Sequence, residues 1–110
     1  MNYRDFPVYK ALYFDLKIKD LEKCYSLTNP KGSYSEIQGF LNENGFEHEQ
    51  YSGYHSAQAT TDMNVFTVIK NMHIQFPWLR KCVSKFEVTN IGENSDLIKK
   101  FPVETDESNN

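Results

Sequence analysis

The chain has 110 residues, with 12 basic and 15 acidic side chains and a formal charge of −3 at pH 7. A chain of this length buries about two-thirds of its unfolded surface, which supports a hydrophobic core without disulfides or a structural metal. We expect neither a secretory signal nor a membrane span, because no apolar run approaches the roughly 20 residues that a span needs. The acidic balance excludes a protein that coats nucleic acid by bulk charge, and it leaves open a nuclease that contacts a few phosphates.

The composition predicts a single domain at residues 1–101 and a polar, acidic tail at residues 102–110. The two cysteines, Cys24 and Cys82, show neither the spacing of a metal site nor a disulfide framework. We expect two reduced, partly buried thiols.

The first predicted element is a strand at residues 9–16. Its alternation gives two sets of residues on opposite faces of a sheet. One set is Leu12, Phe14 and Leu16, and the other is Tyr9, Ala11, Tyr13 and Asp15. Because the first set is the more apolar, we expect it to face the helices.

A helix is predicted to open at Ser33, which has Glu36 at the spacing of a capping box. Gly45 supplies the left-handed residue that ends such a helix. Gly39 inside the helix costs about 1 kcal/mol against alanine, which indicates a close packing contact there.

The second half of the chain predicts two short strands, a helix and a last strand. The strands cover residues 46–51 and 54–57, around a turn at Ser52-Gly53. Thr60 or Thr61 caps the helix, whose apolar stripe of Val65, Ile69, Met72 and Phe76 is widened by Phe66. Pro77 ends the helix, and residues 83–91 form the last strand.

The order strand, helix, strand, strand, helix, strand predicts an α+β fold, the ferredoxin-like βαββαβ sandwich. A four-stranded antiparallel sheet then carries both helices on one face, and its other face is open. A partly aromatic open face is a liability in water, so we expect a second copy to cover it as a homodimer.

Asp15 is the first candidate for chemistry, because it ends a buried strand on the open face. In a two-fold dimer two Asp15 carboxylates could share a proton or bind a divalent cation such as Mg²⁺. The alternative is that Asp15 simply ends the strand and caps the next turn. Ser52 could hold a phosphate at the hairpin tip, although hairpin serines are usually turn formers.

His48 and His55 flank the hairpin and could bind a metal or act as acid and base, although solvated histidines fit the spacing better. The tyrosines Tyr9, Tyr13, Tyr51 and Tyr54 could stack unpaired bases, but a dimer interface would use the same rings, and we favour the interface. The available phosphate contacts are basic residues, most of them expected on the solvated surface: Lys10, Lys17, Lys19, Lys23, Arg80, Lys81, Lys85, Lys99 and Lys100.

Four stretches resemble the virulence-associated protein D (VapD) family: ALYFDL at 11–16, FLNENGFEHEQYSGY at 40–54, FPWLRKCV at 76–83 and NSDL at 94–97. The resemblance spans roughly residues 10 to 100 without large gaps. It implies a ferredoxin-like homodimer in the bacterial cytoplasm, acting as an endoribonuclease toxin of a toxin–antitoxin pair. The family's strand-end Asp falls on Asp15, its helix-turn Leu on Leu21 and its hairpin Ser on Ser52.

Three positions depart from the family's pattern. His48 stands where the family usually has a Trp, and Tyr51 stands in place of a Gly. An Asp expected near the start of the last strand is replaced around Ser84-Lys85. A lysine there can contact phosphate, but it cannot bind a metal or act as a carboxylate base.

Two functions follow as hypotheses. In the first, the chain is a dimeric endoribonuclease that cuts single-stranded or loop RNA, with Asp15 positioning a metal or polarising the attacking group and Ser52 holding the phosphate. In the second, it is a non-catalytic VapD-like dimer that binds a protein, such as an antitoxin or a phage component. Loss of the last-strand Asp and the mildly acidic balance favour the second.

Overall fold

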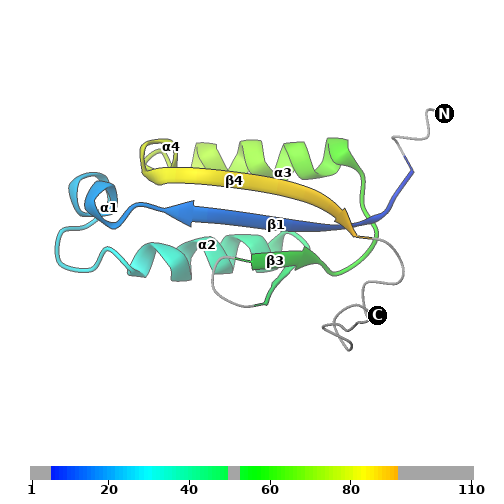
Figure 1. The fold of residues 1–110 in the computed structure, drawn as a ribbon, viewed down its shortest axis with the longest axis horizontal. Helices are drawn as coiled ribbons and strands as arrows, with labels where there is room; N and C mark the ends of the chain where they lie inside the picture. Colours follow the sequence, from blue (N-terminus) through cyan, green and yellow to red (C-terminus); the bar gives the residue numbers. More distant parts are fainter. Residues whose placement is uncertain (1–5, 50–52, 92–110) are drawn as a thin grey trace, which may run out of the picture.

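A computed structural model describes residues 6–49 and 53–91 of the chain (Figure 1). The strands are β1 (Tyr9–Leu16), β2 (Phe46–His48), β3 (Gly53–Ser56) and β4 (Val83–Ile91), and the helices are α1 (Ile18–Cys24), α2 (Gly32–Glu43), α3 (Asp62–Gln75) and α4 (Leu79–Cys82). The predicted bounds of the first and last strands are confirmed. The predicted tail lies outside the described residues.

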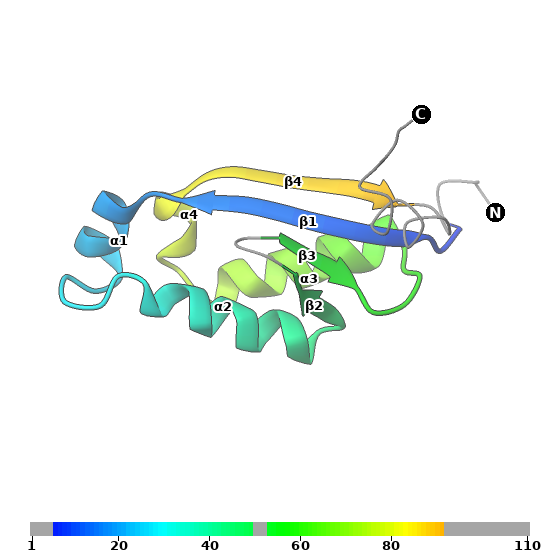
Figure 2. The ribbon, with the colours of Figure 1, turned by 60° about the horizontal axis from the view of Figure 1, so that its bottom comes forward.

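The four strands form one antiparallel sheet in the order β2-β3-β1-β4. Both long helices, α2 and α3, lie on the same face of this sheet, and the other face is open (Figure 2). In Figure 1, α3 runs along the β4 side of the sheet and α2 along the β3 side. This arrangement confirms the predicted α+β fold and is consistent with a ferredoxin-like sandwich. Among the described helices none is long and apolar enough to cross a membrane.

Strand β1 lies at the centre of the sheet because both of its faces carry small or apolar residues. Leu12, Phe14 and Leu16 face the helices and belong to the core. Ala11 is buried on the opposite face, while Tyr9 and Tyr13 remain partly exposed there. The predicted division of the strand into two faces is therefore correct.

Lys10 contradicts its predicted place among the surface lysines. It shares the helix-facing side of β1, and only 1% of it is exposed. Its Nζ lies 2.7 Å from Asp62 Oδ1, in the first turn of α3, and 2.6 Å from Asn90 Oδ1 of β4. Because burying an ammonium without partners is costly, these two contacts are what allow a lysine inside the sandwich.

The N-cap of α2 lies two residues earlier than predicted, and the capping box is wrong. Lys31 is the N-cap and has no side-chain cap bond, so Ser33 lies inside the first turn. The Ser33 hydroxyl donates to the Pro30 carbonyl at 2.7 Å, and Glu36 accepts from the Tyr25 hydroxyl instead of capping the helix. The spacing is present, but a carbonyl three residues before Ser33 and a tyrosine eleven residues before Glu36 bind the two side chains instead.

The two glycines of this region differ. Gly45 has φ 88°, so the predicted left-handed stop after α2 is confirmed. Gly39 is exposed, and a Cβ built on it would meet nothing within 4 Å. The predicted close contact at Gly39 is therefore wrong.

Helix α3 starts as predicted, with Thr61 as its N-cap. The Asn64 N–H donates to Thr61 Oγ1 at 3.1 Å, and Asp62 supplies the acidic residue of the first turn. Val65, Val68 and Met72 are buried in the core. Phe66 was expected to widen this stripe, but it is 66% exposed, because it lies on another side of the helix.

Candidate functional site on the open sheet face

Strand register shows which side chains share the open face. Residues directly opposite each other in an antiparallel sheet point to the same side. His55 is opposite Ala11 and Glu47, Thr89 is opposite Ala11, Glu87 is opposite Tyr13, and Lys85 is opposite Asp15. The open face therefore has two ionisable ends, one at Asp15 and one at the β2–β3 hairpin.

Asp15 is exposed at the end of β1. The chain is fixed on both sides of it: the Ser84 hydroxyl donates to the Asp15 carbonyl at 3.3 Å, and the Lys17 N–H donates to the Cys82 carbonyl at 2.8 Å. The β1–β4 register shifts between Asp15 and Leu16. The carboxylate thus projects from a well-anchored strand end, which is the placement expected from the sequence.

Lys85 lies opposite Asp15 in the sheet, and its Nζ is 3.7 Å from Glu87 Oε2. Both side chains of this pair are more than half exposed, so the pair contributes little to stability. An ammonium next to Asp15 can attract a phosphate and compensates the carboxylate's own repulsion of that phosphate.

The donors around Asp15 do not fit Mg²⁺ within one chain. Magnesium is held by oxygen ligands, and a lysine offers no lone pair. In the described part of the chain, no group of three His, Cys, Asp or Glu residues is arranged to hold a metal. The expectation of a metal at Asp15 stays a prediction that depends on a second chain bringing its own Asp15 close.

Leu21 lies on the helix side of this end of the sheet. It is completely buried in the core, and its carbonyl accepts the N–H groups of Tyr25 and Ser26. Its role in this structure is to pack α1 and to shape the turn after that helix. Ser52 and Tyr51 lie outside the described residues.

The hairpin end of the open face holds a histidine between two carboxylates, which the sequence analysis did not single out. His55 Nδ1 is 2.7 Å from Glu49 Oε2, and His55 Nε2 is 3.2 Å from Glu47 Oε1. The contact between His55 Nδ1 and Glu49 Oε2 is short enough for an ion pair, but its geometry is not that of a hydrogen bond. The sequence does contain a signal for this cluster. Glu47 and Glu49 are two residues apart, so they share a face of the hairpin, and His55 lies on the neighbouring strand.

The two hairpin histidines do not form a pair. His48 is opposite Tyr54, so it points to the other side of the hairpin from His55, and its ring centroid is 4.9 Å from that of Tyr54. His73 lies on α3, where its Nδ1 is 3.0 Å from the Ile69 carbonyl oxygen. His55 is therefore the one histidine of the three on the open face.

Two of the predicted base-stacking tyrosines are available on the open face. Tyr9 and Tyr13 are 37% and 43% exposed there. Tyr54 points the other way into the core, and burial raises its pKa to about 12. Tyr13 lies between the two ionisable ends, opposite Gly53 of β3 and Glu87 of β4.

The two ends are too far apart to act on one phosphate group in a single chain. Asp15 is four residues along β1 from Ala11, the neighbour of His55, which is about 13 Å at 3.3 Å per residue. A phosphate spans a few ångströms, so only one end can be the reacting end within a chain.

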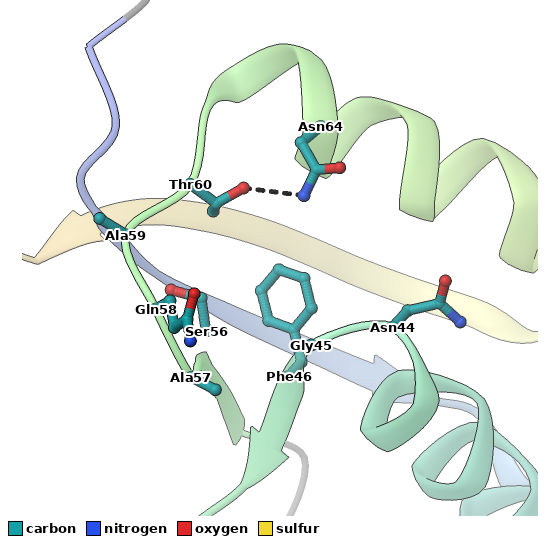
Figure 3. Close-up of a pocket in the computed structure, with 9 residues that line it drawn as sticks. All are labelled: Asn44, Gly45, Phe46, Ser56, Ala57, Gln58, Ala59, Thr60 and Asn64. Carbon is teal, nitrogen blue, oxygen red and sulfur yellow. Dashed lines mark hydrogen bonds between the residues drawn. The ribbon is translucent and has the colours of Figure 1, made fainter.

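A cavity of about 350 Å³ lies on the helix side, between the end of α2, the end of β3 and the start of α3 (Figure 3). The Phe46 ring points into it, and the Asn64 amide donates to Thr60 Oγ1 at 2.8 Å across its far wall. The described residues that line it are uncharged. It therefore offers no acid, base or metal ligand, and the ionisable groups of the open face remain the candidate site.

An α+β sandwich with an open, partly aromatic face and an exposed strand-end carboxylate is thus the class of molecule that the structure defines. The chain is 28% identical over 88 residues to "Endoribonuclease VapD 2" of Riemerella anatipestifer, which covers 80% of this chain and 94% of that protein. It is 27% identical over 88 residues to "Endoribonuclease VapD homolog" of Helicobacter pylori, which covers 80% of this chain and 90% of that protein. No protein-family model matches the chain. The similarity to VapD endoribonucleases is thus distant, but it extends over most of the fold.

Proposed function

We propose that the chain is a VapD-like endoribonuclease that cleaves single-stranded or loop RNA on the open face of its sheet. The observation that carries the proposal is the similarity to two proteins named as VapD endoribonucleases, which extends over 80% of the chain. The exposed carboxylate at the end of β1 and the lysine opposite it give that similarity a chemical basis.

Asp15 is the proposed catalytic residue. Its carboxylate accepts a proton from the attacking hydroxyl group as the new P–O bond forms, and Lys85 neutralises charge on the phosphate. The P–O bond to the leaving nucleoside breaks, and the leaving oxygen takes a proton from water. Ser52 is proposed to hold the scissile phosphate by its hydroxyl.

The homodimer through the open face, the toxin role, a protein antitoxin and the use of Mg²⁺ belong to the same proposal. Two copies packed through this face would bring the second carboxylate that Mg²⁺ needs. Cleavage measured with and without EDTA tests the metal, since loss of cleavage after chelation and its recovery with Mg²⁺ would support a shared site.

The proposal is tested by the Asp15→Ala variant on a structured RNA. We expect cleavage to fall by a factor of about 10² or more, because a positioned acid–base group contributes about that much. Asp20→Ala is the matched control, since the Asp20 carboxylate lies on α1 and pairs with Lys17 at 3.5 Å. Equal cleavage by wild type and Asp15→Ala, with both correctly folded, would contradict the proposal.

The second candidate is a non-catalytic VapD-like dimer that binds a protein partner. A specific observation favours it, namely the lysine opposite Asp15 where the family resemblance led us to expect a carboxylate. This candidate predicts no RNA turnover at any concentration of divalent cation and a stable complex with a protein of the host.

A further inference from the structure

The two cysteines of the chain lie close together in the fold, although they are far apart in the sequence. Cys24 is the last residue of α1, and Cys82 is the last residue of α4. These two helices pack against each other at the end of the sheet where β1 stops and β4 begins, on the left of Figure 1. Both thiols are free, and the proposed cleavage of RNA uses neither.

The two thiols differ in exposure. The sequence led us to expect two partly buried thiols, but Cys24 is exposed and Cys82 is completely buried in the core. An oxidant dissolved in water reaches an exposed thiol first. Cys24 is therefore the thiol that meets the oxidant, while the helices packed around Cys82 shield it.

One side of α1 is held close to Cys82. Lys17, Asp20 and Cys24 are three and four residues apart, so they follow one another along the same side of the helix. The Lys17 N–H donates to the Cys82 carbonyl at 2.8 Å, which ties the start of this side to the end of α4. The Lys17 Nζ lies 3.5 Å from Asp20 Oδ2 on the same side. Cys24 thus lies one helical turn beyond Asp20, on the side of α1 that borders Cys82.

The side chains of α1 act directly on the buried thiol. Burial raises the pKa of Cys82, and Cys24 and Asp20 raise it further by their charges. A side-chain hydrogen bond with Cys24 also raises it, and Lys17 lowers it. A thiol is a weak donor and a weak acceptor, so a hydrogen bond between two thiols requires neighbouring sulfur atoms. The raised pKa keeps Cys82 protonated, so Cys82 does not compete with Cys24 for the oxidant.

We propose that Cys24 and Cys82 form an oxidation site, which closes into a disulfide when the chain meets hydrogen peroxide. The Cys24 sulfur attacks one peroxide oxygen, the O–O bond breaks, and the leaving oxygen takes the proton of Cys24 to form water. Cys24 is then a sulfenic acid. The Cys82 sulfur attacks the Cys24 sulfur, the S–O bond breaks, and the proton of Cys82 leaves with that oxygen as water. The two sulfur atoms together lose two electrons, and the peroxide gains them.

The disulfide joins α1 to α4 at the end of the sheet that carries Asp15. Helix α1 begins three residues after Asp15, and β4 begins directly after Cys82. The bond also closes a long loop of the chain, which restrains the unfolded state. We expect the Tm of the oxidised chain to lie roughly 5–15 °C above that of the reduced chain. This proposal concerns the thiols alone and does not depend on the proposed cleavage of RNA.

The experiment treats the reduced full chain with hydrogen peroxide, unfolds it, blocks the remaining thiols with N-ethylmaleimide and measures the mass of the chain and of its peptides. Wild type is expected to lose two hydrogen atoms, to take up no blocking agent and to yield a peptide pair joined through Cys24 and Cys82. Dithiothreitol is expected to restore both thiols. In Cys24→Ser, Cys82 is expected to remain a thiol, because the core shields it.

The matched control is the double variant C24S/K23C, which moves the exposed thiol by one position, or about 100° around α1. Its thiol on α1 is expected to be oxidised without bonding to Cys82. An equal yield of internal disulfide in wild type and in this control would overturn the proposal, because the placement of Cys24 would then not matter. A wild-type chain in which Cys24 ends as a sulfinic acid, or joins two chains, while Cys82 stays free would also overturn it. So would an oxidised chain whose Tm is not raised, because the bond would then distort the packing of α1 on α4.

Discussion

The two ionisable ends of the open face differ in how their charges are satisfied. At the hairpin end, Glu47 and Glu49 both contact the His55 ring, so their charges have a local partner. At the other end Asp15 is exposed, and the lysine opposite it lies within ion-pair distance of Glu87. A carboxylate held by a neighbour stabilises local structure, whereas an exposed one beside a cation remains able to meet a substrate.

The two ends also differ in how their charges affect the approach of an RNA phosphate. The described residues of the hairpin end bring two glutamates together with one histidine, which disfavours the approach of a phosphate. The Asp15 end brings a lysine from β4. This difference favours the proposed catalytic role of Asp15 and a structural role for the hairpin cluster.

The largest expected effect is a difference in activity between variants of the two ends. Asp15→Asn removes the acceptor of the proton and is expected to lower RNA cleavage by about 10² or more. Glu49→Gln makes the same kind of change at the hairpin end and is expected to leave cleavage within about threefold, since a factor of 10 needs about 1.4 kcal/mol. Initial cleavage rates of both variants on the same RNA measure this difference. A larger loss of activity in Glu49→Gln than in Asp15→Asn would indicate that the hairpin end is the catalytic one.

A second difference is expected in stability. His55→Ala leaves two carboxylates near each other without their shared partner, and it is expected to lower the free energy of unfolding by about 1 kcal/mol. Lys85→Ala breaks a solvated pair and should change it by no more than about 0.5 kcal/mol. Urea unfolding of the two variants beside wild type measures both. Equal losses of unfolding free energy in the two variants would show that the charged contacts at the two ends contribute equally to stability.

Gly39→Ala provides a stabilised background in which both ends can be compared. Because Gly39 is an exposed residue inside α2 with open space around its Cβ position, alanine there is expected to raise the unfolding free energy by about 0.5–1 kcal/mol. Neither end of the open face touches this position. A loss of stability in urea unfolding would mean that α2 contacts something at this point that the described residues do not include.

The last prediction concerns alkaline pH and the far side of the hairpin. Burial raises the pKa of Tyr54 from its ordinary 10.0 to about 12 in the folded chain. The buried neutral phenol therefore contributes stability that is complete below pH 10 and is lost as the pH rises through 12. Tyr54→Phe should flatten the fall in stability over this window. An absorbance titration in which wild type loses one more tyrosine proton than the variant by pH 11 would contradict the buried phenol.

Much of the fold follows from local patterns in the sequence. Alternation along residues 9–16 and the Thr61 cap each depend on neighbours in the chain, so they predict β1 and the start of α3 correctly. The capping box at Ser33 fails because Pro30 and Tyr25 take its side chains. The predicted surface position of Lys10 is wrong because its two partners, Asp62 and Asn90, are 52 and 80 positions away in the sequence.

The candidate site could be predicted only in part. A carboxylate at the end of an alternating strand identifies Asp15 and its face without further information. The pairing of Lys85 with Asp15 and of His55 with two glutamates depends on strand register, which is set by the whole sheet and its turns. Sequence spacing cannot give that register for strands that are distant along the chain.

The most direct test of the central claim is to map bound RNA on the protein. A short single-stranded RNA with a 2′-deoxy substitution at the cleavage position, followed by amide chemical shifts, reports where it binds. The account predicts that shifts concentrate on β1 and β4 around Tyr13, Asp15 and Lys85. Shifts confined to the helix side of the sheet, or none at millimolar RNA, would contradict it.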